Sequence, residues 1–426
     1  MAKGCSVKIA LIIEHFDPAR GGAENYTFWL AEQLALRGHE VHAVCHDSAR
    51  KRHQYQAAHQ GASHDVQRSA NAGRSPEVPG PRGVSVHRLP AIKLSTGIGF
   101  RQFGIAAKNW CSRNKPDVAH SMTVAWPGDL YHPHAGVYAR IQQQSIASRE
   151  SAPSANFKRL MLQLSGKQRT LLTMERRSAQ AMADQRPWKI LCISPAMRED
   201  FRSIYGTSDG KMTLLENPIM TPPPSEQQIV KDRQWFRELY ALAPDDRVAV
   251  FVGHDFRRKG LSWAIRTVAQ CRTPWKLLVV GLGKVKDHIA LARELGVTDR
   301  VKFIGPTRET NAVYSAADAL LLPTFYDSFG LVALEALAFG LPVISTRFLG
   351  CSAYIESHKL GTIVDSPHQC AAMAAALDAV EKQFPDRMEL AGRAIAAGQA
   401  LLPAAHLDKL EALYLRCRHA KVKLRT

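Results

Sequence analysis

The sequence predicts an α/β protein made of two doubly wound domains. Short, continuous apolar runs alternate with helix-length segments along all 426 residues. Runs of this kind are typical of parallel strands that helices cover on both faces. The runs form two sets, and the chain is longer than one typical hydrophobic core requires. We therefore expect two Rossmann-like domains, each with its own parallel sheet.

The expected strands place the boundary between the domains near the middle of the chain. In the first half they are expected at residues 8–13, 41–45, 84–89, 117–121, 189–194 and 212–215. In the second half they are expected at residues 248–253, 276–281, 301–304, 319–322, 343–346 and 362–365. Residues 217–225 are rich in proline and carry no periodicity, so we expect domains at residues 1–220 and 221–404.

Two segments do not belong to this alternation. Residues 50–83 are polar, with many His, Gln, Gly and Ser, and we interpret them as a long surface insertion of the first domain. Residues 405–418 have a helical pattern and open a C-terminal segment, 405–426, that follows the second domain.

The net charge of the chain is +18 at pH 7. This charge favours a polyanionic partner such as an acidic membrane face, a phosphorylated glycolipid or nucleic acid, with general solubility as the alternative. The eight cysteines include no Cys-x-x-Cys pair, which is typical of reduced thiols in a cytosolic protein. No apolar run approaches ~18 residues, so we expect no membrane span. No cleavage site follows residues 7–13, so we expect no signal peptide.

Residues 323–344 are the most informative segment of the sequence. They follow an expected strand and contain a helical apolar pattern over residues 331–338. We expect Ser328 to cap this helix, so that the free amides of its first turn face the space above the sheet and suit a phosphate. Asp327 precedes that turn and Glu335 follows it, eight residues later. A ligand with a phosphate between two hydroxyl-rich groups would meet all three features.

This segment resembles the Glu-x7-Glu signature of the retaining glycosyltransferase family called glycosyl transferases group 1. The similarity is greatest to the lipopolysaccharide core glucosyltransferases. The family has the GT-B fold, in which two Rossmann-like domains face a central cleft. In this fold the C-terminal helix commonly crosses back onto the first domain, so the resemblance implies that residues 405–426 form such a helix. Asp327 stands where the first Glu is usual, and its shorter side chain changes the reach of that carboxylate. The alternative is an ordinary strand–turn–helix of an α/β domain.

Two further segments match the family in their order along the chain. Gly21 and Gly22 separate the first expected strand from its helix, and paired glycines allow a close approach of ligand to backbone. Arg258 and Lys259 follow the strand that opens the second domain, where an Arg fork and a Lys charge would neutralise a diphosphate. His254 occupies the position where the family usually has Arg, and we expect Arg258 to replace it.

A histidine-rich loop follows the fourth expected strand, in the region where doubly wound sheets bind their ligands. In related transferases a histidine of this region contacts the donor sugar, so the resemblance favours His134 for that role. His132 and Asp129 are less favoured, and His120 is less favoured still. A structural role for each histidine is the alternative.

The resemblance thus implies two sets of site residues. The catalytic set is Arg258, Lys259, Asp327 and His134. The donor-binding set is Gly21, Gly22, Ser328, Phe329, Gly330, Leu331, Val332 and Glu335. No Asp-x-Asp motif occurs in the sequence, so we expect no metal and no cofactor, with basic side chains and helix amides stabilising the leaving group.

Residues 154–180 predict a basic amphipathic helix. The apolar residues Phe157, Leu160, Met161 and Leu164 fall at helical spacing. The nearby cations are Lys158, Arg159, Lys167, Arg169, Arg176 and Arg177. This pattern favours an anionic membrane surface, where the lipopolysaccharide core enzymes also keep a basic segment. An ordinary helix packed on the first domain is the alternative.

The sequence therefore predicts a retaining, metal-independent hexosyltransferase. Its expected donor is a nucleotide-diphosphate sugar, with a UDP-sugar favoured, and its expected acceptor is a glycolipid or oligosaccharide of lipopolysaccharide core or cell-envelope glycan synthesis. We expect it in the cytoplasm, peripheral on the inner face of the plasma membrane. The alternatives are a GT-B nucleotide-sugar epimerase and a non-catalytic basic protein that binds membrane or nucleic acid. No aromatic RNA platform or recognition helix is apparent, so nucleic acid is not expected as a partner.

Overall fold

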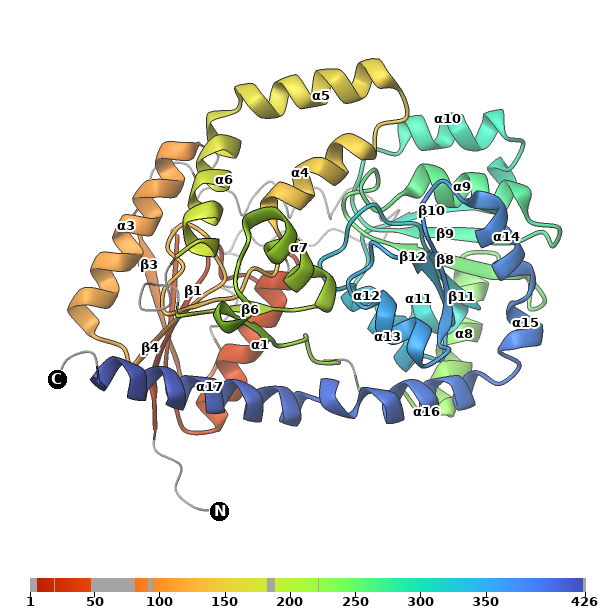
Figure 1. The fold of residues 1–426 in the computed structure, drawn as a ribbon. Helices are drawn as coiled ribbons and strands as arrows, with labels where there is room; N and C mark the ends of the chain where they lie inside the picture. Colours follow the sequence, from red (N-terminus) through yellow and green to blue (C-terminus); the bar gives the residue numbers. More distant parts are fainter. Residues whose placement is uncertain are drawn as a thin grey trace, which may run out of the picture.

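The computed structural model describes residues 6–18, 20–46, 81–90, 94, 96–181, 188–220 and 222–423. Most of the expected insertion at residues 50–83 lies outside this part of the chain. The described residues form two parallel sheets with helices on both faces, which confirms the predicted pair of Rossmann-like domains (Figure 1).

The first sheet has seven parallel strands in the order β3-β2-β1-β4-β5-β6-β7. The strands are β1 (Lys8–Ile12), β2 (Glu40–His46), β3 (Val84–Leu89), β4 (Val118–Ser121), β5 (Leu130–Tyr131), β6 (Lys189–Cys192) and β7 (Met212–Leu214). The sequence predicts all of them except β5, which pairs with β4 and β6. A strand of two residues is too short to show a periodicity, so the sequence does not predict it.

The second sheet has six parallel strands in the order β10-β9-β8-β11-β12-β13. They are β8 (Val248–Val252), β9 (Lys276–Val280), β10 (Val301–Gly305), β11 (Ala319–Leu322), β12 (Val343–Thr346) and β13 (Gly361–Val364), each close to its predicted range. The strand order reverses between β8 and β11 here, and between β1 and β4 in the first sheet. Open parallel sheets bind ligands at such switch points, beyond the carboxyl ends of the strands.

Helices connect these strands. In the first half they are α1 (Gly22–Leu36), α3 (Gly97–Asn114), α4 (Tyr138–Ala147), α5 (Ala152–Leu164), α6 (Gly166–Ala179) and α7 (Pro195–Tyr205). In the second half they are α8 (Glu226–Leu239), α9 (Leu261–Gln270), α10 (Lys286–Glu294), α11 (Thr310–Ala316), α12 (Leu331–Ala338), α13 (Ser352–Ser357), α14 (Cys370–Asp378), α15 (Val380–Gln383), α16 (Arg387–Ala397) and α17 (Pro403–Lys423).

The basic segment at residues 154–180 forms two helices, α5 and α6, and the expectation of one helix is wrong. Ser165 lies between them with non-helical backbone angles (φ −71°, ψ 110°), and its hydroxyl accepts a hydrogen bond from the Gln168 amide at 3.4 Å. Ser165 is therefore the N-cap of α6. The apolar spacing of the segment continues through this break and does not reveal it.

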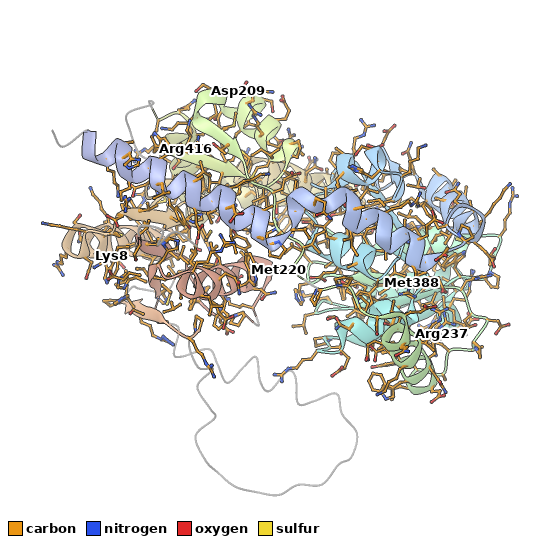
Figure 2. All side chains as sticks on the ribbon, turned by 90° about the horizontal axis from the view of Figure 1, so that it is seen from below. Lys8, Asp209, Met220, Arg237, Met388 and Arg416 are labelled. Atoms are coloured by element: carbon orange, nitrogen blue, oxygen red, sulfur yellow. The ribbon has the colours of Figure 1, made fainter. Side chains whose placement is uncertain are left out.

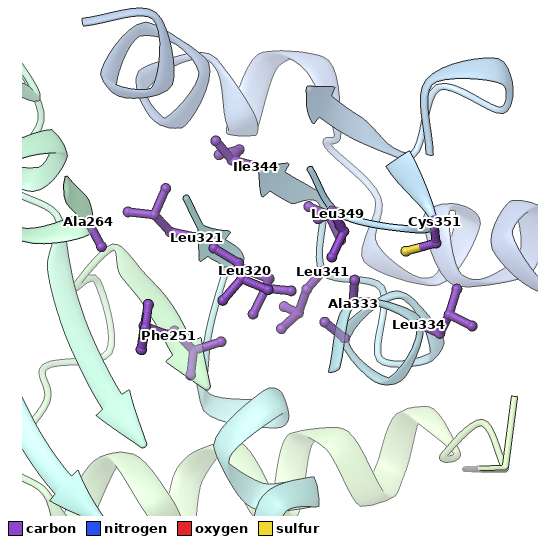
Figure 3. Close-up of a cluster of buried hydrophobic side chains, with 14 of the residues drawn as sticks. Phe251, Ala264, Leu320, Leu321, Ala333, Leu334, Leu341, Ile344, Leu349 and Cys351 are labelled. Carbon is purple, nitrogen blue, oxygen red and sulfur yellow. The ribbon is translucent and has the colours of Figure 1, made fainter. Parts of the chain in front are cut away.

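The core of the second domain holds α12 in a fixed orientation. Phe251 of β8 and Leu320 of β11 pack in the same cluster as Ala333 and Leu334 of α12, and each is at most 2% exposed (Figure 3). Burial of a large apolar side chain contributes about 1.5–3 kcal/mol relative to its exposed state. Because this cluster anchors α12 along its buried face, the start of the helix is held firmly above the sheet.

The C-terminal helix α17 leaves the second domain and lies along the first (Figures 1 and 2). Tyr414 of this helix is hydrogen-bonded to Nδ1 of His120 on β4 at 2.7 Å. His406, near its start, is hydrogen-bonded to the Tyr26 hydroxyl on α1, also at 2.7 Å. Both contacts are buried, so α17 is part of the packing of the first domain.

Candidate active site

The loop that follows β11 of the second sheet meets segments that follow β5 and β6 of the first sheet. The Ser328 hydroxyl, in the loop after β11, donates to the carbonyl of His134 in the first domain at 2.7 Å. The Ser194 hydroxyl donates to the Ser328 carbonyl at 2.9 Å, and the Val137 amide donates to the Tyr326 hydroxyl at 3.1 Å. These three bonds bring the predicted residues of both domains into one site.

The helix α12 begins after Gly330, so the prediction that Ser328 caps it is wrong. Gly330 has φ +96°, and a Cβ at this position would lie 2.3 Å from Cδ1 of Leu349. Only glycine adopts this conformation at little cost in such a confined space, which sets the start of the helix two residues beyond the serine. The Ser328 hydroxyl is used in the contact between the domains instead.

The first turn of α12 presents backbone amides to the space between the domains. The Phe329 amide donates to Oδ1 of Asp327 at 3.3 Å. Within the described part of the chain, the amides of Gly330, Leu331 and Val332 have no hydrogen-bond acceptor. Free amides at a helix start, together with the helix dipole, form an anion-binding site.

Lys259 and Asp327 form an ion pair in the second domain, and each side chain is 13% exposed. Arg258 lies beside them, with Nη1 donating to the Tyr326 carbonyl at 2.9 Å and Nε 3.1 Å from the carboxylate of Asp255. The loop after β8 is thereby joined to the loop after β11. Two cations are thus held near the free amides of α12.

The charge of Asp327 is set by two opposing effects. Burial of this carboxyl raises its pKa, but the nearby Lys259 and Arg258 and the Phe329 amide lower it by more. The net result is a pKa below the usual value for an aspartate. Asp327 is therefore ionised at neutral pH and partly neutralises Lys259.

Glu335 lies on α12 beyond the first turn. Its carboxylate accepts a hydrogen bond from the Tyr314 hydroxyl at 2.8 Å. Burial raises its pKa, and the bond from Tyr314 offsets part of that rise. A carboxylate held this way can accept further hydrogen bonds from hydroxyl groups of a ligand.

Gly21 and Gly22 lie on the first-domain side of the site. Gly21 has φ 177°, which any residue adopts, so a left-handed conformation does not explain this glycine. A Cβ at Gly22 would lie 3.4 Å from Cδ1 of Leu331, the first residue of α12. The glycine loop therefore approaches the start of α12 closely, and its lack of side chains keeps space there.

The four candidates of the histidine-rich region have different surroundings. The His134 ring packs at a tilt against the Tyr26 ring, with centroids 4.1 Å apart and an interplanar angle of 37°. Burial together with His120 and His406 lowers the pKa of His134 well below the usual value. Its ring is therefore neutral. Its Nε2 is buried and has no partner among the described residues.

Nε2 of His132 is likewise buried without a partner among the described residues, although its Nδ1 is hydrogen-bonded to His120. The other two candidates have partners within the first domain. His120 is hydrogen-bonded to His132 at 3.1 Å as well as to α17. Asp129 accepts from the Ala119 amide at 2.8 Å and forms an ion pair with Lys421 at 2.5 Å. These contacts explain His120 and Asp129 as parts of the fold.

Glu14, which follows β1, is a site residue that the sequence does not predict. Its carboxylate accepts from the Thr123 hydroxyl at 2.5 Å, and burial raises its pKa. Thr123 follows β4, so this bond joins the two switch-point loops of the first sheet. A carboxylate directly after the first strand is a signal in the sequence, but its partner lies 109 residues away. Within the described ranges, no group of three or more His, Cys, Asp or Glu could hold a metal ion.

Two Rossmann-like domains whose loops meet between them have the architecture of the GT-B class. The chain matches the family model "Glycosyl transferases group 1" over residues 232–397 and the model "Glycosyltransferase Family 4" over residues 20–222. Its second domain is thus a glycosyl transferases group 1 domain, as the sequence predicts.

Curated relatives match parts of the chain. It is 30% identical over 210 residues to the lipopolysaccharide glucosyltransferase WaaG of Escherichia coli (strain K12), covering 48% of this chain and 56% of that protein. It is 33% identical over 180 residues to a D-inositol 3-phosphate glycosyltransferase of Corynebacterium diphtheriae, covering 39% and 42%. The chain thus spans about half the length of the curated relatives it matches.

Solved structures confirm the GT-B fold. The crystal structure of WaaG superposes with a TM-score of 0.70 at 23% identity, covering 92% of this chain and 96% of that chain. Anabaena HepE in complex with UDP and glucose superposes with a TM-score of 0.66 at 16% identity, covering 96% and 99%. At these identities the likeness concerns the fold.

Proposed function

We propose that this protein is a retaining glycosyltransferase that moves a hexose from a nucleotide-diphosphate sugar to a hydroxyl of a glycolipid or oligosaccharide. The observation that carries the proposal is the free start of α12 beside Lys259 and Arg258. A diphosphate needs positive charge and hydrogen-bond donors together, and these groups supply both.

In this proposal the site residues fix how the donor lies along α12. The diphosphate lies on the amides of Gly330, Leu331 and Val332. Glu335 accepts hydrogen bonds from the ribose, farther along α12. The sugar lies toward Asp327 and the unpartnered Nε2 of His134, which can donate to a sugar hydroxyl as a neutral ring.

Lys259 and Arg258 act on the leaving group. When the bond to the sugar breaks, negative charge grows on the departing diphosphate, and fixed cations stabilise that charge without reorganisation. The diphosphate itself takes the acceptor proton as the acceptor attacks the same face, so no separate general base is required. We propose that the reaction needs no metal, because the protein supplies this positive charge itself.

A UDP-sugar is our preferred donor, because HepE has been crystallised with UDP and glucose and WaaG is named a glucosyltransferase. By the same likeness to WaaG we place the reaction in lipopolysaccharide core or cell-envelope glycan synthesis. The alternative of an epimerase rests on clustered histidines. Of these, His120 and His406 are bound to tyrosines in the packing of the first domain, which does not favour acid–base chemistry.

We also propose a peripheral site of action at the cytoplasmic face of a membrane. Phe157 and Leu164 of α5 are each 65% exposed, and Leu160 is 50% exposed. None of the described helices is long and apolar enough to cross a membrane. An exposed apolar face flanked by cations fits the interface of an anionic bilayer.

The test is a panel of nucleotide sugars with the purified protein. We expect binding of at least one UDP-sugar and release of UDP when an oligosaccharide acceptor is added. Lys259→Ala should abolish most of the release. Absence of nucleotide-sugar binding across the panel would refute the proposed function.

A further inference from the structure

A basic hollow on the first domain has no role in the donor site. It has a volume of about 310 Å³ and lies between α3, α6 and the loop after β4. Its cations are Arg101 and Lys108 from α3 and Arg177 from α6, and the ring of Trp126 forms another wall. The volume is close to the lower end for small-molecule sites and suits one sugar ring.

The hollow exists because α3 lies unusually close to the loop after β4. A Cβ at Gly104 would lie 2.1 Å from the carbonyl oxygen of Ala125, so a larger residue would push the loop away. The missing side chain lets Ala125 pack on the helix and brings Trp126 to the same hollow as Arg101 and Lys108. The shape is therefore built by a specific contact of the fold.

The positive charge in the hollow is not neutralised by the protein. The helix α3 contains no Asp or Glu. The one acidic residue of α6, Glu175, is buried and accepts hydrogen bonds from Tyr138 of α4 and Tyr205 of α7. Among the described residues, no carboxylate forms an ion pair with Arg101, Lys108 or Arg177.

The hollow is connected to the site between the domains through the loops that follow β4 and β1. Its wall at Ala125 and Trp126 belongs to the loop that also holds Thr123, which is bonded to Glu14 after β1. The glycine loop that follows β1 approaches Leu331 of α12. The hollow therefore lies on the first domain, beyond the carboxyl end of β4, which is the end of the strand at which ligands of such sheets bind.

We propose that this hollow binds a phosphorylated sugar of the acceptor, with the phosphate on Arg101, Lys108 and Arg177 and the sugar ring against Trp126. This inference rests on the proposed function for the identity of the ligand as an acceptor. Three cations match a phosphate monoester, which carries about −1.5 to −2 charges at pH 7, better than a single carboxylate. Guanidinium forks also match the geometry of phosphate oxygens.

The experiment measures binding of glucose 6-phosphate, glucose and inorganic phosphate to the full chain by calorimetry. The test variant is Arg101→Gln/Lys108→Gln/Arg177→Gln. The control variant, Arg113→Gln/Arg169→Gln/Arg176→Gln, removes the same charge from exposed positions of the same two helices outside the hollow. UDP binding by every variant reports that the fold is intact.

We expect the test variant to lose at least about tenfold in affinity for glucose 6-phosphate, because several charge-assisted hydrogen bonds are removed. The control variant should stay within about threefold, since exposed charges act weakly at a distance. A second variant, Trp126→Leu, should weaken binding of glucose 6-phosphate and leave binding of inorganic phosphate unchanged. Equal losses in the test and control variants would overturn the proposal.

Vesicles separate a sugar phosphate from a lipid phosphate. Both triple variants keep α5 intact, and the control variant removes two cations of the basic segment at residues 154–180 whereas the test variant removes one. A greater loss by the test variant on phosphatidic acid vesicles therefore reports the hollow. A loss confined to vesicles, with unchanged affinity for glucose 6-phosphate, would overturn the sugar assignment. If neither the wild type nor any variant binds UDP or any nucleotide sugar of the panel, the proposed function fails, whereas the comparison on glucose 6-phosphate still decides whether the hollow binds a phosphorylated sugar.

Discussion

The Lys259→Ala variant tests two roles of Lys259. One is to neutralise Asp327, and the other is to stabilise the proposed diphosphate. Removal of one partner from a buried ion pair costs about 3–5 kcal/mol of stability. Here both side chains are 13% exposed, and the Phe329 amide still donates to the carboxylate. We therefore expect Lys259→Ala to lower the free energy of unfolding at pH 7 by about 2 kcal/mol, which is less than the loss for a fully buried ion pair.

The pH dependence of that loss has a definite sign. The pKa of Asp327 is lowered in the folded protein, so its contribution to stability is present above its unfolded pKa and disappears as the pH falls through its folded pKa. Lys259→Ala removes most of this contribution. The stability difference between wild type and variant should therefore stay nearly constant from pH 7 to about 4 and narrow as the pH falls below about 4. Denaturant unfolding at several pH values measures it.

Activity should respond differently from stability. Loss of a preorganised cation at the leaving group should lower kcat at least about a hundredfold. The double variant Lys259→Ala/Asp327→Asn should recover much of the stability, because no unpaired charge stays buried, but none of the kcat. Arg257→Ala is the matched control, because Arg257 is exposed in the same loop. This variant should retain both the stability and the kcat of the wild type. An effect of Lys259→Ala on KM alone would refute the leaving-group role.

Three further predictions follow from the same site and from α5. Glu335→Ala should raise the dissociation constant for the donor about ten- to a hundredfold, and unchanged affinity in calorimetry would contradict the ribose assignment. Activity should survive exhaustive chelation, whereas a loss that Mg²⁺ or Mn²⁺ restores would show a metal requirement. Phe157→Ser/Leu160→Ser/Leu164→Ser should weaken binding to anionic vesicles at least about tenfold, because each buried apolar side chain contributes about 1.5–3 kcal/mol. Leu36→Ser, at an equally exposed leucine of α1, should have no effect, and equal losses would exclude α5 as the docking surface.

Most strands of the two sheets could be predicted because they are continuous apolar runs whose residues are largely buried, although the edge strands β3 and β10 are only partly buried. The strand β5 could not, because its two residues derive their pairing from β4 and β6. The break between α5 and α6 was missed for a similar reason, since Ser165 interrupts hydrogen bonding without interrupting the apolar spacing.

Much of the arrangement around the candidate site follows from local rules, because strand–loop–helix units place loops at the same edge of a sheet. The preference of helix N-caps for serine gave a wrong prediction at Ser328. The helix α12 begins after Gly330, whose backbone is left-handed, although Ser328 is the better capping residue by type. The contacts of Ser328 with His134 and of Glu14 with Thr123 could not be predicted. They join residues more than a hundred positions apart and depend on how whole elements pack.

Asp327 departs from the family pattern, which has Glu at this position, and the structure changes how this difference is interpreted. By sequence alone, an aspartate where the family has glutamate shortens the reach of a carboxylate toward the sugar. In the structure that carboxylate is held by Lys259 on one oxygen and by the Phe329 amide on the other. A side chain held on both oxygens is oriented by the protein before any ligand binds, and its charge is set by the same cation that faces the diphosphate. The shorter side chain and the lysine therefore act as one unit, and the effect of lengthening Asp327 to Glu depends on whether Lys259 can follow it.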